Sequence, residues 1–95
     1  MAAYVILDLS IQDHKEMEAY KKLAPATVTV FDGKFIARGG QTITLEGEWN
    51  PERIVILEFP TSELANEWWN SEIYAKAKEI RQRAAKTKII IIEGV

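Results

Sequence analysis

The chain has 95 residues and a formal net charge of −2, with 47% hydrophobic residues, one histidine and no cysteine. This length predicts a single domain, residues 1–95, with enough apolar residues for one core. The scattered lysines and arginines exclude the clustered basic face that a nucleic acid or an anionic membrane surface requires. Without cysteine there is no disulfide, no thiolate nucleophile and no zinc held by cysteine, which fits a cytoplasmic location. No apolar run approaches the roughly 20 residues of a membrane span.

The first third of the chain predicts a strand followed by a helix. Residues 3–9 (AYVILDL) are apolar at both odd and even positions, so both faces of the strand are apolar, as in a central strand. Asp13 with Glu16 three residues later forms a capping box that predicts the start of a helix. The apolar stripe keeps its helical phase past Pro25, so we expect a helix that is broken or kinked there, with Pro25 opening the second piece. Gly33 is expected to end it in the left-handed C-cap conformation.

The middle of the chain predicts two strands joined by a long connection. Residues 34–39 predict the second strand, and the Gly39-Gly40 pair indicates a bulge or a close backbone approach. Residues 41–45 alternate polar and apolar, which predicts an exposed arm, and residues 46–52 predict a turn. Residues 53–59 (RIVILEF) predict a third strand that is again apolar on both faces.

The last third predicts two helix pieces and a final strand. Thr61 or Ser62 caps the first piece, whose buried side is expected to hold Leu64, Ala65, Trp68 and Trp69. Ser71 follows a break and caps the second piece, whose expected apolar stripe is Ile73, Ala77, Ile80 and Ala84. Residues 88–93 (KIIIIE) predict the last strand.

This order of elements predicts an α+β fold, the ferredoxin-like βαββαβ sandwich with a four-stranded antiparallel sheet in the order 4-1-3-2 and its helices on one face. The helices can cover only one face of strands that are apolar on both. The other face would leave an apolar patch of roughly several hundred Å² in water, which soluble monomers rarely tolerate. We therefore expect a homodimer whose sheets pack face to face, with the arm of residues 41–49 reaching across. The alternative is an isoleucine-rich face without a partner.

Five short patterns follow one another along the chain: Ala24-Pro25, DGKFIARGG at 32–40, LEGEWNPER at 45–53, EFP at 58–60 and SEIY at 71–74. Together they resemble the uncharacterised domain-of-unknown-function 1330 family, which belongs to the dimeric α/β-barrel superfamily. The resemblance runs along essentially the whole chain and implies a ferredoxin-like protomer and a barrel-forming dimer. It implies no particular reaction, because the superfamily includes cofactor-independent monooxygenases, muconolactone-isomerase-like proteins, haem-binding members and ligand-sensing domains. Asp32 stands where the family commonly has glycine, and His14 lies outside the pattern.

Asp8, Glu58 and His14 are the candidates for acid–base catalysis. We expect strands 3–9 and 53–59 to be parallel neighbours, which places both acids near the same end of the sheet. Two carboxylates there would raise each other's pKa and could act as acid and base. The alternative is that each acid reaches water or caps a helix. His14 is the only histidine and sits in the first turn of a helix, where a solvated surface position is the alternative.

Arg38 and Arg53 are the first candidates for ligand binding. The antiparallel strands that carry them should bring them together at the other end of the sheet, where two guanidinium groups repel unless an anion lies between them. That anion could be a bound carboxylate ligand. The alternative is a structural ion-pair network with Glu46, Glu48 or Glu52 of the intervening turn.

Trp68, Trp69 and Tyr74 surround the predicted helix break and are further ligand-binding candidates, since a break opens space beside a sheet. The alternative is that these aromatic side chains form core. With one histidine and no cysteine we expect no metal site, and no cofactor.

These observations favour a protein that binds a small apolar or carboxylate-bearing molecule between helices and sheet. Two alternatives stay open. One is a cofactor-independent enzyme, of monooxygenase or isomerase type, in which Arg38 or Arg53 holds an anionic group. The other is a purely structural or stress-associated dimer without chemistry. No nucleophile–base pair can be derived from the residue spacing, so the sequence does not decide whether the protein is an enzyme.

Overall fold

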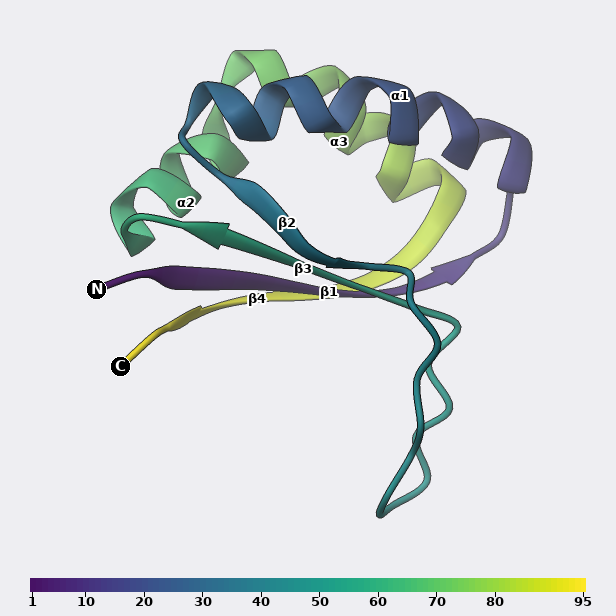
Figure 1. Cartoon of the computed structure of the whole chain (residues 1–95). Helices are drawn as coiled ribbons and strands as arrows, with labels where there is room; N and C mark the ends of the chain where they lie inside the picture. Colours follow the sequence, from purple (N-terminus) through teal and green to yellow (C-terminus); the bar gives the residue numbers. More distant parts are fainter.

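The computed structural model describes all 95 residues, with the helices layered on one face of a single sheet (Figure 1). The elements follow in the order β1 (Ala3–Ile11), α1 (His14–Val30), β2 (Lys34–Arg38), β3 (Arg53–Phe59), α2 (Ser62–Asn70), α3 (Glu72–Ala84) and β4 (Ala85–Glu93). The strands lie in the order β2-β3-β1-β4, and every neighbouring pair is antiparallel. The expected ferredoxin-like fold with sheet order 4-1-3-2 is confirmed.

The expectation that the first and third strands run parallel was wrong. β1 and β3 are antiparallel, with Asp8 opposite Ile54 and Tyr4 opposite Glu58. The reason is topological: helix α1 carries the chain back so that β2 is parallel to β1, and β3 then turns back into the space between them. Asp8 and Glu58 therefore lie at opposite ends of the sheet.

Helix α1 begins where the capping box predicts, with the Glu16 backbone N–H donating to Asp13 Oδ1 at 3.0 Å. The expectation that Pro25 opens a second helix piece was wrong, because α1 is one helix of 17 residues with Pro25 inside it. Proline has no N–H, so the carbonyl of Lys21 lacks its usual helical donor. A side chain from β2 supplies one instead: Arg38 Nη2 donates to the Lys21 carbonyl oxygen at 3.2 Å. This bond offsets part of the cost of the proline.

The end of α1 also differs from expectation. Asp32, not Gly33, takes the left-handed conformation, with φ of 61°. The Asp32 N–H donates to the Thr29 carbonyl and the Gly33 N–H to the Val28 carbonyl, each at 3.0 Å, which is a Schellman C-cap. Aspartate tolerates this backbone region better than most residues. Gly33 is needed for space, since a Cβ there would lie 2.6 Å from the Phe59 ring.

The two C-terminal helices are separated as the sequence predicts. Thr61 caps α2 by accepting from the Leu64 N–H at 3.1 Å. Ser71 both ends α2 and begins α3: its hydroxyl donates to the Trp68 carbonyl at 2.8 Å and accepts from the Tyr74 N–H at 3.2 Å. One serine thus satisfies a terminal carbonyl of one helix and a terminal N–H of the next.

The buried stripe of α3 was predicted one residue out of phase at its start. Ile73 is 49% exposed, whereas Tyr74 is fully buried. The stripe runs through Tyr74, Ala77, Ile80, Arg81 and Ala84. The Ser71 cap fixes the first turn of α3, and with it the residues that face the core, because its hydroxyl accepts from the Tyr74 N–H.

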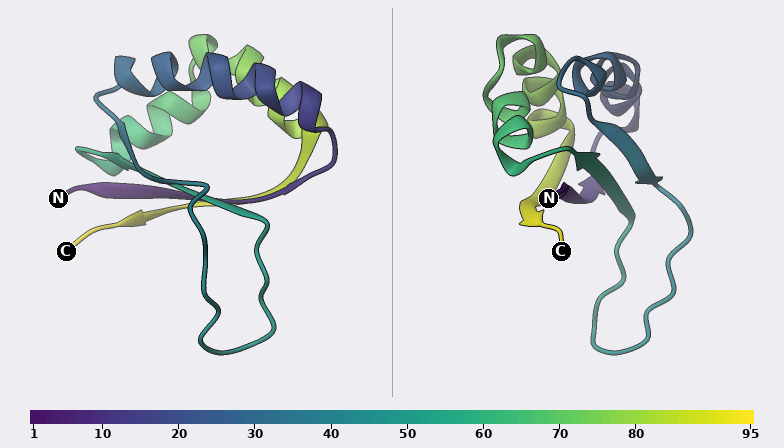
Figure 2. Two further views of the ribbon diagram at one scale, coloured as in Figure 1. Left: turned by 45° about the vertical axis from the view of Figure 1, so that its right-hand side comes forward. Right: turned by 60° about the vertical axis from the view of Figure 1, so that its left-hand side comes forward.

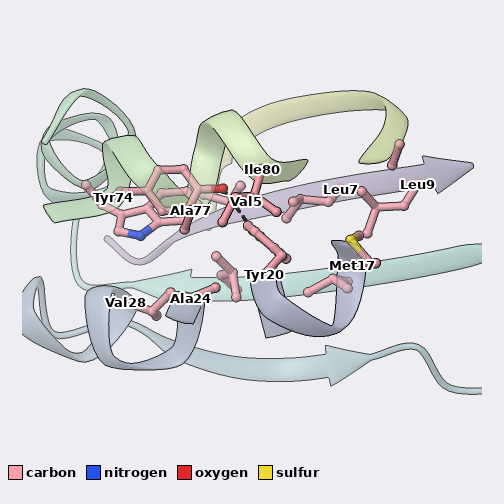
Figure 3. Close-up of a cluster of buried hydrophobic side chains, with 14 of the residues drawn as sticks. Val5, Leu7, Leu9, Met17, Tyr20, Ala24, Val28, Tyr74, Ala77 and Ile80 are labelled. Carbon is pink, nitrogen blue, oxygen red and sulfur yellow. Dashed lines mark hydrogen bonds between the residues drawn. The ribbon is translucent and has the colours of Figure 1, made fainter. Parts of the chain in front are cut away.

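The core fills the space between the helices and one face of the sheet (Figure 3). The sheet contributes the alternate residues Val5, Leu7, Leu9, Val55, Leu57 and Phe59. The other alternate residues point to the face of the sheet without helices, which we call the free face. None of them is buried, and they include Tyr4, Ile6, Ile54, Ile56, Ile90 and Ile92. This sheet with apolar residues on both faces agrees with the prediction from the sequence.

Residues 39–52 form neither helix nor strand and leave the sheet on the side opposite the helices (Figure 2). From here on the arm means residues 40–52, which include the expected segment 41–49. The irregularity in β2 falls between Phe35 and Ala37 rather than at the glycine pair. Gly39 instead makes the expected close approach, at φ of 70°. None of the helices is long and apolar enough to cross a membrane.

Candidate functional site

A small cavity lies between α1 and the sheet and also touches α2. Its volume is about 20 Å³, room for about one water molecule. Most of its lining is apolar core, including Leu9, Met17, Phe35, Leu57 and Trp68. The charged lining consists of cations, with no carboxylate. An apolar cavity bordered only by positive charge is suited to an apolar molecule with an anionic end.

Three cations border this cavity: Lys21, Arg38 and Arg53. Lys21 is already paired, its Nζ lying 3.3 Å from Glu18 Oε1. The Arg38 guanidinium lies 4.5 Å from the centre of the Phe35 ring and is held by its hydrogen bond to the Lys21 carbonyl. Neither the Phe35 ring nor the Lys21 carbonyl carries a negative charge, so the positive charge of Arg38 has no counter-ion there.

Arg53 lies at the base of the arm, against the backbone of Gly39. A Cβ at position 39 would overlap the Arg53 guanidinium, so this packing requires glycine. The N–H of Gly39 donates to the Ile54 carbonyl at 2.8 Å, which fixes the glycine beside the start of β3. In the Gly39-Gly40 pair, the first glycine is therefore explained by its contact with Arg53. Gly40 has open space around it, so no contact explains the second glycine.

Neither Arg38 nor Arg53 forms an ion pair, so the network with the arm's acids is not formed. Glu52 turns away: its carboxylate accepts from the Ile11 N–H at 3.0 Å and lies 3.9 Å from His14 Nε2. The two arginines that the sequence singled out are therefore brought to one cavity mouth without a counter-charge.

The three acid–base candidates are not brought together. Asp8 accepts a hydrogen bond from Trp49 Nε1 at 3.1 Å, which ties the arm to the free face. Glu58 lies 3.9 Å from Lys34 at the other end of the sheet. The His14 side chain is 74% exposed. None of the three lines the cavity.

The aromatic candidates divide between core and surface. Trp68 and Tyr74 are buried with their ring centres 4.1 Å apart, and the Trp68 Nε1 donates to Thr27 Oγ1 at 3.1 Å. This is packed core, although Trp68 also borders the cavity. Trp69 is partly exposed and, together with Trp68, lines an open groove of about 340 Å³ between α2 and β4, beside Ile89 and Ile91.

Arg81, which the sequence did not single out, is only 2% exposed. Its Nε donates to Tyr74 Oη at 3.3 Å, and Tyr74 Oη lies 2.8 Å from Tyr20 Oη (Figure 3 shows the two tyrosines). Its guanidinium carbon lies 5.6 Å from the centre of the Trp69 ring, and its Nη2 has no hydrogen-bond partner. Burial raises the pKa of the Tyr20 phenol, and Tyr74 raises it further. The spacing of Tyr74, Ala77, Arg81 and Ala84 was the available signal, since it follows one helix face.

No group of three or more histidine, aspartate or glutamate side chains is placed to hold a metal ion.

Solved structures with the same arrangement of elements come from several bacteria. A protein of unknown function from Rhodopseudomonas palustris is 17% identical, with a TM-score of 0.80 over 99% of this chain and 82% of that one. A dimeric ferredoxin-like protein of unknown function from Jannaschia sp. CCS1 is 10% identical, with a TM-score of 0.76 over 99% and 100% of the two chains. SnoaB, a cofactor-independent oxygenase from Streptomyces nogalater, is 8% identical, with a TM-score of 0.60 over 99% and 93%. At these identities the likeness shows the fold alone.

A search of curated protein sequences gave no significant match. The family model for a domain of unknown function, DUF1330, matches residues 2–95. The chain therefore belongs to the DUF1330 family, as the five sequence patterns indicated.

Proposed function

We propose that this protein is a homodimeric binding domain for a small apolar molecule with a carboxylate group, held between α1 and the sheet. The observation that carries the proposal is the pair Arg38 and Arg53, two guanidinium groups without a carboxylate partner at the mouth of an apolar cavity. Two cations held together without an anion repel each other, and a carboxylate between them removes that cost. Phe35 and Trp68 offer aromatic surface for the apolar part.

The cavity has to widen to take more than a water molecule. Its outer wall is β2, a five-residue edge strand that pairs only with β3 and carries both Phe35 and Arg38. An edge strand with one neighbour moves at lower cost than a central strand. Outward movement of β2 widens the apolar part of the cavity. Arg38 moves with the strand and therefore remains at the mouth of the cavity.

Titration with octanoate, followed by tryptophan fluorescence, tests the proposal, because Trp68 borders the cavity. Octanol is the matched neutral probe. Octanoate should bind at least about tenfold more tightly than octanol, and Arg38→Ala or Arg53→Ala should each remove about tenfold of that affinity. Arg83→Ala is the control, since Arg83 pairs with Glu79 at 3.0 Å on the helix surface. Equal binding of octanol and octanoate would contradict a carboxylate site.

An apolar face on the free side of the sheet supports the homodimer. Ile90 and Ile92 are 57% and 50% exposed there, and the Jannaschia relative with this fold is described as dimeric. Packing two such faces buries apolar surface that monomers rarely leave in water. Light scattering at micromolar concentration should give about twice the chain mass of 10.8 kDa. A stable monomer would contradict the dimer.

The enzyme alternative has weaker support at this cavity. The lining groups with acid–base chemistry are Lys21, which is paired with Glu18, and Tyr20. Burial raises the pKa of the Tyr20 phenol, which opposes its use as a base near neutral pH. Asp8 and Glu58, the expected pair, lie at opposite ends of the sheet. Binding without chemistry is therefore the better supported function.

A further inference from the structure

The arm presents apolar side chains that are largely exposed in their own protomer. Ile43 and Leu45 are 81% and 89% exposed, and Trp49 is 56% exposed. The arm is tied down only near its base, by Trp49 on Asp8 and by Glu52 on Ile11. Exposed apolar residues gathered on a projecting segment mark an interaction surface.

The charged residues of the arm are all acidic. It contains Glu46, Glu48 and Glu52 and no lysine or arginine. The free face of the sheet carries the opposite charge at the start of β4, where Lys86 and Lys88 are exposed beside Asp8 and Ser10. These residues border an open hollow of about 360 Å³, and neither lysine forms an ion pair.

Symmetry can bring these two regions together. Two sheets that pack face to face lie about 10 Å apart, and about six extended residues span roughly 20 Å, so an arm reaches past the partner's sheet. A two-fold axis parallel to the strands places the β2–β3 side of one sheet over the β4 edge of the other and keeps the strand ends aligned. In the sheet register Arg53 is opposite Leu9, and Leu9 is opposite Thr87. The arm leaves β3 at this level, so it meets the start of the partner's β4.

The other simple arrangement fits less well. An axis in the sheet plane but perpendicular to the strands would place each arm over the end of the partner's sheet that holds Lys34 and Glu58. Those two side chains already lie 3.9 Å apart and balance each other. The unpaired lysines are at the other end, which favours the axis parallel to the strands.

We propose that the acidic arm of one copy docks on the Lys86 and Lys88 surface of a second copy, and that both copies do so by symmetry. The apolar residues of the arm then cover the edge of the partner's free sheet face, and Glu46 and Glu48 meet the two lysines. This inference rests on the homodimer proposed above and adds the surface on which the arm docks and the charges that hold it there.

Paired charge reversals test this docking. The double variants Lys86→Glu/Lys88→Glu and Glu46→Lys/Glu48→Lys should each weaken the dimer at least about tenfold, measured as a dissociation constant by analytical ultracentrifugation. The variant with all four changes should recover most of the lost affinity, because each arm then meets reversed charges. Lys22→Glu/Lys76→Glu, on exposed positions of α1 and α3, is the matched control and should leave dissociation unchanged. Circular dichroism reports whether each variant is folded.

The outcomes separate the two proposals. A monomeric wild-type protein contradicts the homodimer itself. A wild-type dimer whose dissociation is unaffected by either reversal contradicts the arm docking alone. Weakening by both reversals without recovery in the fourfold variant also overturns it, since unspecific charge effects do not cancel.

Discussion

Arg81 shows at the scale of one residue how a buried charge is accommodated without a counter-ion. The faces of Tyr20 and Trp69 lie 6.0 and 5.6 Å from its guanidinium carbon, and the Tyr74 hydroxyl accepts one hydrogen bond. Cation–π contacts are stronger when desolvated. Arg81 also lies in the last turn of α3, where the helix dipole favours positive charge. The aromatic cluster therefore serves as the environment of a buried cation.

Replacing Arg81 should show that its volume matters more than its charge. Arg81→Met keeps most of the side-chain volume and removes the desolvation cost, so we expect a change in unfolding free energy within about 1 kcal/mol. Arg81→Ala should cost about 2–4 kcal/mol, because it leaves a cavity among packed rings. Urea denaturation measures both. An equally large loss in both variants would show that the charge itself is required.

Tyr20 predicts how stability changes at high pH. Burial raises its pKa in the folded protein above the value near 10 of an unfolded tyrosine. Above about pH 10 the unfolded state loses this proton while the folded state keeps it, so the stabilisation present at lower pH is lost as pH rises.

Melting temperatures of Tyr20→Phe and the wild-type protein between pH 8 and 11 measure this effect. The wild-type protein should lose up to about 1.4 kcal/mol of unfolding free energy per pH unit above about pH 10 through this group, and Tyr20→Phe should lose less. Tyr4→Phe on the free face is the matched control. Parallel curves for the wild-type protein and Tyr20→Phe would rule out this role.

At the scale of elements, the hairpin that carries β2, the arm and β3 depends on one glycine of the pair. Gly39 has φ of 70° and its α-carbon faces the Arg53 guanidinium, whereas a Cβ at position 40 would have no neighbour within 4 Å. Gly39→Ala should therefore displace Arg53 and lower both stability and octanoate affinity, while Gly40→Ala should be nearly neutral. Thermal melting and the fluorescence titration compare the two variants. Similar behaviour of both would contradict the packing of Arg53 on Gly39.

Pro25 links helix α1 to the cavity mouth. Pro25→Ala restores an N–H that competes with Arg38 for the Lys21 carbonyl. We expect higher thermal stability, by about 1 kcal/mol or more, together with weaker octanoate binding, because Arg38 loses its fixed position. The same two measurements apply. Higher stability with unchanged affinity would show that the proline does not position Arg38.

The sequence predicted those elements whose signals are local. The Asp13, Thr61 and Ser71 caps, the three strands apolar on both faces and the helix break at Ser71 follow from neighbouring residues, and the structure agrees. Pro25 was misjudged because its compensation comes from Arg38, 13 positions along the chain and on another element. Arg81 was missed because a charged residue on a helical stripe is normally solvated.

At the scale of the whole molecule, the fold places two features on opposite faces of one sheet. The helix face holds the apolar cavity with Arg38 and Arg53 at its mouth, and the free face carries the isoleucines and the arm. The connection between β2 and β3 begins directly after Arg38 and ends directly before Arg53, so both ends of the arm lie at the mouth of the cavity. The two arginines come together because a hairpin fixes their register, which the sequence shows. Glu52 turns away from them because it accepts a hydrogen bond from Ile11, 41 positions earlier, which the sequence does not show.

The central claim is that a carboxylate binds between Arg38 and Arg53. The chain has four arginines, at positions 38, 53, 81 and 83, so their side-chain Nε–H signals in a ¹H–¹⁵N spectrum can be assigned individually by substitution. On addition of octanoate, the signals of Arg38 and Arg53 should shift together and saturate, while those of the buried Arg81 and the paired Arg83 stay in place. Unchanged signals for Arg38 and Arg53 at saturating octanoate, or shifts confined to Arg81, would contradict this account.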